Sequence, residues 1–342
     1  LDKTSIIDNP IKKRFGVKIY NKALEWRGDK NGKDILNNLI KTYSVYPKPH
    51  LITSLWHKDK LNLEKMKIGN TDYGFDMSKL FMTKNGSFEN EEQIYEILRY
   101  YFGRPQKDMN YEEQDFYKKN GILPRIKSIC SGKCRTMQSD HVTSQIWFLP
   151  TGGLGKIENR VIALLKILNM NEFKKLGYHY YVAIEVKDEN KINTPYITYM
   201  KKSKEIKSEI NNTVRSLKDK ISGENLIILS GNRLQLGISL KDVDIVALWN
   251  NISSSDAIYQ MLFRCMTEVD HTKKYGFMVD LNPQRALTNT LLFGENLTSK
   301  KSEKKSKYEL IADCINIDED VFQDKFDNEG DKKEFVNQLF NK

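Results

Sequence analysis

The chain has 342 residues, about two domains of typical length, and its 39% hydrophobic and 11% aromatic content excludes a mainly disordered protein. No window approaches the roughly 18 consecutive apolar residues that a membrane-spanning helix needs, and the first residues lack the apolar core of a signal peptide. Lys plus Arg number 55 against 45 Asp plus Glu, and the net charge of +10 favours a polyanionic partner such as nucleic acid. Four scattered cysteines do not form a disulfide framework, so we expect a reducing, cytoplasmic location without a membrane partner.

Residues 1–139 are charged and interrupted by Gly and Pro, with isolated apolar patches such as 49–56. A helix is predicted over 91–102, because apolar residues recur there every three to four positions until Gly-Arg-Pro at 103–105 ends the pattern. Three aromatic side chains at its end, Tyr100, Tyr101 and Phe102, could stack on bases, but their helical spacing favours burial in a core.

From residue 146 the pattern becomes that of a parallel α/β sheet. An apolar run at 146–150 is followed by a glycine-rich turn at 151–155 and by helical periodicity over 157–168. Four more strands are predicted at 179–186, 225–229, 244–249 and 275–281, with a polar helix around 203–221. Because these runs do not alternate, the strands are buried on both faces, and His179 is expected to pack rather than to act in catalysis.

This pattern predicts three regions: a connector or insertion rich in α-helix over 1–139, an α/β domain over 140–290, and a basic linker with a helical tail over 291–342. The tail helix is expected from apolar residues at helical spacing, namely Ile311, Ile315, Val321 and Phe322.

The segment 151–156, Thr-Gly-Gly-Leu-Gly-Lys, is not a P-loop. Pro150 stands where the first glycine of that motif belongs, and Ile157 stands where a Ser or Thr should hold magnesium. We expect a tight turn into a helix, whose backbone amides could contact a phosphate. Cys130, Cys134 and His141 lack the second close pair of ligands that zinc needs, so no metal site is expected.

Two further blocks carry the most information. In residues 229–246 a strand ends in a polar loop with Gly237 and Ser239, and in residues 253–268 a predicted helix places Gln260 and Arg264 on one face. These blocks resemble motifs V and VI in the second RecA-like domain of superfamily 2 helicases. The resemblance implies a RecA-like parallel sheet flanked by helices. It also implies that Gln260 and Arg264 have the catalytic role, and that both bind the ATP cofactor together with Gly237 and Ser239.

The sequence departs from that family pattern at three positions. Phe263 replaces a usual Gly, Thr267 stands where a second arginine is common, and Ser239 stands where many members have Asp. An ordinary surface pair is therefore the alternative interpretation of Gln260 and Arg264.

Over about 50–290 the chain is similar to helicases of large phages and related mobile elements, described as type III restriction-like. This implies an ATP-hydrolysing helicase whose ATP and Mg are held mainly by a first RecA-like domain, absent from this chain and supplied in cis or in trans. We expect the isolated chain to be inactive, the partner to be DNA rather than RNA, and the location to be the host cytoplasm if the gene is phage-borne. The expected nucleic-acid contacts are Thr151, Gly152, Ser230, Gly231, Asn232 and Arg233.

The sequence is compatible with two rival functions. One is a degenerate, ATP-independent helicase domain that binds nucleic acid or serves as a scaffold, which the residues at 239 and 267 favour. The other is the motor part of a restriction enzyme, although the tail contains no persuasive nuclease motif.

Overall fold

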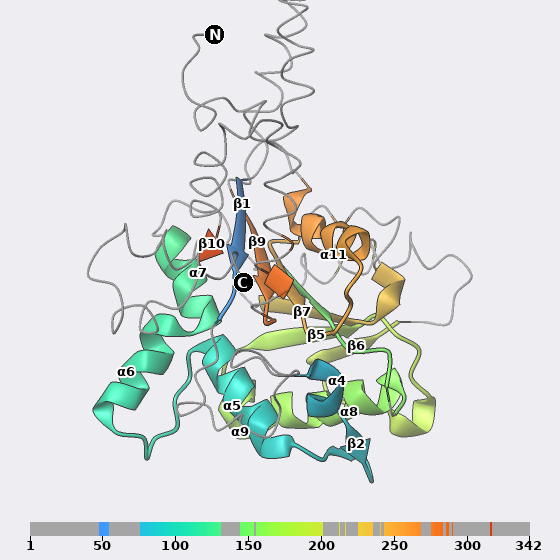
Figure 1. Cartoon of the computed structure of the whole chain (residues 1–342). Helices are drawn as coiled ribbons and strands as arrows, with labels where there is room; N and C mark the ends of the chain where they lie inside the picture. Colours follow the sequence, from blue (N-terminus) through green and yellow to red (C-terminus); the bar gives the residue numbers. More distant parts are fainter. Residues whose placement is uncertain are drawn as a thin grey trace, which may run out of the picture.

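The computed structural model describes residues 48–54, 76–130, 144–153, 155–200, 225–234, 243–267 and 275–282, and in addition 212, 216, 240, 285, 286, 289, 315 and 316. In this part of the chain eight strands form one sheet, in the order β10-β1-β9-β8-β4-β7-β5-β6, and all neighbouring strands are parallel (Figure 1). The strands are β1 (Lys48–Ile52), β4 (Ser144–Phe148), β5 (Tyr178–Val182), β6 (Ile197–Tyr199), β7 (Asn225–Ser230), β8 (Ile245–Leu248), β9 (Tyr275–Asp280) and β10 (Ile315–Asn316).

The five predicted strands are confirmed as β4, β5, β7, β8 and β9. β1 and β6 were not predicted as strands, and residues 315–316 form a strand where the tail was expected to be helical. β1 precedes the expected domain boundary at residue 140, yet it pairs with β9 along its whole length, with Leu51 opposite Met278. The division into three regions stays a prediction, and the predicted helix at 203–221 lies almost wholly outside the described residues.

Helices cover both faces of the sheet. The predicted helices over 91–102 and 157–168 are confirmed as α5 (Glu91–Phe102) and α8 (Ile157–Leu168), and α5 ends at Gly103 in the left-handed conformation that glycine favours. The other described helices are α4 (Met77–Leu80), α6 (Tyr111–Asn120), α7 (Ile122–Cys130), α9 (Asn171–Lys174) and α11 (Ser255–Leu262), with 3₁₀ turns η3 (Asp188–Asn190), η4 (Asn232–Leu234) and η5 (Phe263–Met266). A short hairpin joins β2 (Thr83–Lys84) to β3 (Ser87–Phe88). In the described part, no helix is long and apolar enough to cross a bilayer.

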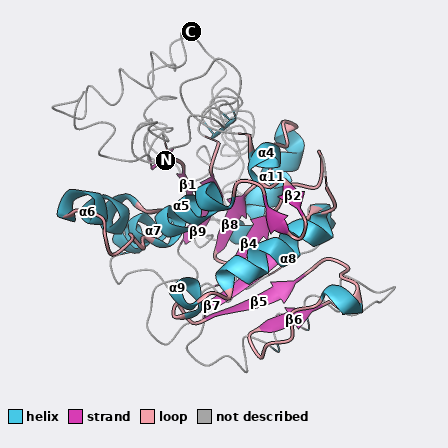
Figure 2. Cartoon of the chain, turned by 90° about the horizontal axis from the view of Figure 1, so that it is seen from below, coloured by secondary structure: helices cyan, strands magenta, loops and turns pink. Residues whose placement is uncertain are grey.

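The sheet separates two apolar cores. Alternate residues of β4 divide between them: Trp147 packs in the core beneath α5, α7 and α8, whereas Ile146 and Phe148 pack in the core beneath α11. Figures 1 and 2 show the same two layers, with α5, α8 and α9 on one side of the sheet and α11 on the other. The chain therefore has the α/β arrangement of a RecA-like domain, as the sequence predicted.

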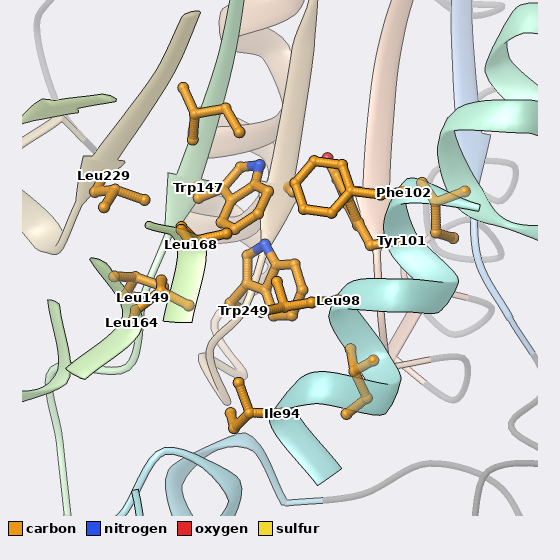
Figure 3. Close-up of a cluster of buried hydrophobic side chains, with 14 of the residues drawn as sticks. Ile94, Leu98, Tyr101, Phe102, Trp147, Leu149, Leu164, Leu168, Leu229 and Trp249 are labelled. Atoms are coloured by element: carbon orange, nitrogen blue, oxygen red, sulfur yellow. The ribbon is translucent and has the colours of Figure 1, made fainter. Parts of the chain in front are cut away.

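The larger core is built around aromatic rings (Figure 3). The ring centroids of Trp147 and Trp249 lie 4.9 Å apart, and Tyr101 lies 5.0 Å from Trp147. The Gln145 side-chain oxygen accepts hydrogen bonds from the Tyr101 hydroxyl (2.8 Å) and the Trp147 indole (3.1 Å), so these two buried donors are satisfied. Tyr100, Tyr101 and Phe102 of α5 are buried, which excludes base stacking by them and confirms their assignment to the core. His179 is also buried, as expected, beside Thr198.

Candidate nucleic-acid interface

The carboxyl ends of β4 and β7 form a topological switch point. The chain that leaves β4 forms α8, whose apolar side chains lie in the core with Trp147. The chain that leaves the neighbouring strand β7 passes to the opposite face, where Leu234, Leu240 and Val243 pack in the other core. Adjacent parallel strands whose connections leave toward opposite faces create a crevice at their carboxyl ends, and this is where open α/β sheets bind ligands.

Predicted contact residues meet at this switch point. The Thr151 hydroxyl, which follows β4, donates a 3.3 Å hydrogen bond to the side-chain oxygen of Asn232, which follows β7. Thr151, Gly152 and Asn232 are exposed, so a ligand can reach all three. Ser230 is fully buried and its hydroxyl donates to the Gly231 carbonyl (3.1 Å), so this side chain shapes the turn. Arg233 lies within η4.

Gly231 allows the two loops to approach. A Cβ at this position would lie 2.5 Å from Ile157 Cδ1 and 2.8 Å from Thr151 Cγ2, closer than atoms can pack. A larger residue would therefore displace the side chains of Ile157 and Thr151 at this contact. The absence of a side chain, rather than a positive φ, is what this glycine contributes to the close approach.

The glycine loop, residues 151–155, leads into the positive end of α8. Gly153 and Gly155 have φ values of +81° and +107°, a region that other residues rarely adopt. Lys156 is the N-cap and its side chain makes no capping hydrogen bond, so the first amides of this 12-residue helix are not capped by that residue. Such helix starts attract anions through their N–H groups and through the helix dipole.

Two exposed lysines, Lys156 and Lys187, lie beside this helix start. The Glu158 carboxylate accepts hydrogen bonds from the Asn190 side chain and from the Lys187 backbone amide, both 2.9 Å long. The pKa of Glu158 is lowered chiefly by the Asn190 hydrogen bond, with contributions from the Lys187 amide and from the charges of Lys187 and Lys156. The loop after β5 is thereby fixed to the first turn of α8. The Lys187 ammonium itself lies 3.8 Å from a carboxylate oxygen of Glu189.

Gln260 and Arg264 lie away from the switch point. The predicted helix ends earlier than expected, because α11 stops at Leu262 and Arg264 belongs to the 3₁₀ turn η5, so the two residues do not share one α-helical face. A Cβ on Gly276 would lie 2.6 Å from the Cys265 carbonyl oxygen, so η5 packs against the beginning of β9. The amino ends of the parallel strands lie at this edge of the sheet, whereas Thr151 lies at the opposite edge, after the carboxyl end of β4. Gln260 is exposed, whereas Arg264 is half-buried and burial lowers its pKa. Gly237 and Ser239 lie outside the described residues.

The sequence did not single out several polar side chains at the carboxyl edge of the sheet, of which Arg160, Asp280 and Arg285 are buried and Asn251 is exposed. Arg160 reaches beneath the glycine loop, and Asp280 forms a buried ion pair with Arg285 (2.7 Å) behind the loop that follows β8. In that loop, Asn251 binds the N-cap of α4 by donating to Asp76 Oδ1 and by accepting from the Met77 amide (3.1 Å). The scarcity of arginine, 11 among the 55 basic residues, was the one signal that could have drawn attention to Arg160 and Arg285.

Comparison with known proteins adds little to this geometry. No family model matches the chain, and no curated protein matches it. Among solved structures, the chain is similar to the "C-terminal part of Fun30 ATPase domain", with 13% identity, 90% of this chain and 94% of that chain covered, and a TM-score of 0.28. At this TM-score the likeness supports no inference about function.

Proposed function

We propose that the chain is the second motor domain of a superfamily 2 nucleic-acid helicase or translocase, and that it holds one strand by its phosphates at the switch point. The observation that carries this proposal is the meeting of Thr151 and Asn232 at the carboxyl ends of β4 and β7, beside the start of α8. Neither a base-reading helix nor an enclosed pocket is needed for such contacts, which are sequence-independent.

The chemistry of this edge suits a phosphate backbone. Amide and backbone N–H donors come from Asn232 and the glycine loop, and positive charge comes from the exposed Lys156. The Thr151 hydroxyl donates to Asn232 and so fixes that side chain in place. The net charge of +10 adds long-range attraction for any polyanion. We favour DNA over RNA as the strand, in keeping with the resemblance to phage helicases.

In this proposal the ATPase part lies elsewhere on the domain. Gln260 and Arg264, with Gly237 and Ser239, would complete a site whose ATP and Mg are held by a first RecA-like domain in cis or in trans. A guanidinium supplied across such an interface stabilises the charge that grows on the phosphoryl oxygens during hydrolysis. Since η5 lies at the opposite edge of the sheet from Thr151, loss of Arg264 should leave strand binding intact.

A second candidate is an ATP-independent module that only binds the strand. The observation in its favour is that Arg264 lies beyond the end of α11, so it does not share one α-helical face with Gln260. The two candidates differ in one measurable property. Only the motor domain should bind the strand differently when a first RecA-like domain and ATP are supplied.

Strand binding can be tested with a matched pair of lysine variants. Lys156→Ala removes an exposed charge beside the glycine loop, and Lys118→Ala removes an exposed charge from α6, which packs against α5 and α7. Fluorescence anisotropy with a labelled oligothymidine gives the dissociation constant over a series of salt concentrations. The salt slope is the slope of the logarithm of the binding constant against the logarithm of the salt concentration. We expect Lys156→Ala to lower the magnitude of this slope by about 0.7, the value for one phosphate fewer bound on a single strand, and Lys118→Ala to leave it unchanged. Equal effects of both variants would show that only net charge matters.

A further inference from the structure

Arg160 joins three segments that are distant in sequence. It lies in α8 and is fully buried, with no solvent exposure. Its Nη1 donates a 2.6 Å hydrogen bond to the Pro150 carbonyl, at the end of β4, and its Nε donates a 3.1 Å hydrogen bond to the Phe81 carbonyl, at the end of α4. The guanidinium therefore fixes the start of the glycine loop relative to both α8 and α4.

The same guanidinium lies directly beneath the glycines. A Cβ on Gly153 would lie 3.6 Å from Arg160 Nη2, and one on Gly155 would lie 4.0 Å from it. Both glycines have the positive φ that lets the loop fold over the side chain. The loop, the guanidinium and α4 thus pack as one unit, because Ser78 of α4 also lies within 3.5 Å of the Cβ position of Gly153.

Burial of this arginine carries a cost that its contacts must offset. Its neighbours in α8 are the buried apolar residues Val161 and Leu164, and burial disfavours the charged guanidinium, which lowers its pKa. An apolar side chain would fill the same space without the cost of removing a charge from water, but the Pro150 and Phe81 carbonyls would lose this donor. A planar group with several donors is useful where carbonyls of separate segments must be held in one fixed geometry.

We propose that Arg160 is a positioning residue for phosphate binding. It holds the glycine loop so that the loop amides and the first amides of α8 face the phosphate at the switch point, without touching the phosphate itself. This inference rests on the proposed function, since it assigns the residue that prepares the site for its ligand.

Arg125 provides a matched control. It is also a buried arginine, 5% exposed, and it also holds the end of a strand, because Nη1 donates to the Thr53 carbonyl (2.8 Å) and Nη2 to the Ser54 hydroxyl (2.7 Å). These residues follow β1, which lies three strands from β4, or about 14 Å at the usual spacing. Arg125→Ala should therefore cost similar stability without disturbing the glycine loop.

The test compares Arg160→Ala, Arg160→Lys and Arg125→Ala with the wild-type chain. Anisotropy with a labelled oligothymidine over a salt series measures strand binding, urea unfolding measures stability, and hydrogen exchange measures protection of the amides in 150–157. For Arg160→Ala we expect binding about tenfold weaker, a salt slope lower by about 0.7 for each phosphate that is no longer bound, and faster exchange in that segment. Arg125→Ala should keep the wild-type slope and exchange there, and Arg160→Lys should recover part of the binding.

The outcomes separate this inference from the proposed function. A wild-type chain with no salt-dependent strand binding overturns both. A wild-type chain that binds, with Arg160→Ala equal to Arg125→Ala in slope and in exchange of 150–157, overturns the positioning role alone. If Arg160→Ala does not fold, Arg160→Lys decides, because this variant keeps the positive charge and loses the planar geometry of the guanidinium. Wild-type strand binding and wild-type hydrogen exchange by Arg160→Lys refute the proposal. A smaller salt slope of strand binding at near-normal stability supports it.

Discussion

Removal of Arg285 should destabilise the fold more than almost any other single charge change in the described part. The Arg285 side chain is 7% exposed and Asp280 is 1% exposed. The guanidinium donates to Asp280 Oδ2 (2.9 Å) and Oδ1 (2.7 Å), and also to the Asn250 and Ile252 carbonyls (2.6 and 3.1 Å). It therefore joins the end of β9 to the loop that leads from β8 into α11.

Arg285→Ala leaves a buried carboxylate without its guanidinium, and breaking such a pair costs about 3–5 kcal/mol. The two carbonyls also lose a donor, which places the expected loss near the upper end of that range. The measurement is the free energy of unfolding from urea titrations. Lys119→Ala is the control, because its ion pair with Asp115 is exposed, with 72% of the lysine side chain accessible, and should contribute less than about 1 kcal/mol.

A second substitution identifies the cause. Asp280→Asn removes the orphaned charge while its side-chain oxygen can still accept from the Asn282 amide, a bond 3.0 Å long in the native chain. If the buried charge is the main cost, the double variant Asp280→Asn/Arg285→Ala should be more stable than Arg285→Ala alone. Its loss of stability should also be smaller than the sum of the two single losses, by a coupling energy of about 0.5–3 kcal/mol. A loss below about 1 kcal/mol for Arg285→Ala, or no recovery in the double variant, would refute this reasoning.

Three further predictions follow from the same structure. Gly276→Ala should destabilise the chain by about 1–3 kcal/mol in urea unfolding, because the new Cβ would lie 2.6 Å from the Cys265 carbonyl oxygen. Gly152→Ala is the control and should leave the free energy of unfolding unchanged, because no neighbouring atom lies within 4 Å of its Cβ position. Burial lowers the pKa of His179, so the unfolded chain binds this proton more readily and stability should fall as pH drops below about 6.5. His179→Gln should flatten that part of the pH–stability curve, and an unchanged curve would exclude His179 as the cause. In a complex with a first RecA-like domain that carries a P-loop, Arg264→Ala should lower ATP turnover by about 10³-fold or more while the strand dissociation constant stays the same, and equal losses of both would indicate a folding role.

The local elements of this protein were largely determined by its sequence. Unalternated apolar runs predicted β4, β5, β7, β8 and β9, since a strand buried on both faces must be apolar along its whole length. The spacing of apolar residues likewise predicted the bounds of α5 and α8, together with the burial of their inward faces. The predicted contact residues Thr151 and Asn232 also met in the structure, because each follows a parallel strand and the carboxyl ends of parallel strands lie at one edge.

Other features depended on tertiary structure. The place of β1 beside β9 and the early end of α11 could not be predicted, because strand order and helix ends depend on partners far away in sequence. The same holds for Arg160, whose carbonyl partner at Phe81 is 79 residues distant, and for Arg285, whose partner at Asn250 is 35 residues distant. A charged residue in a sequence predicts exposure, and only the fold shows which carbonyls and carboxylates are close enough to compensate its burial.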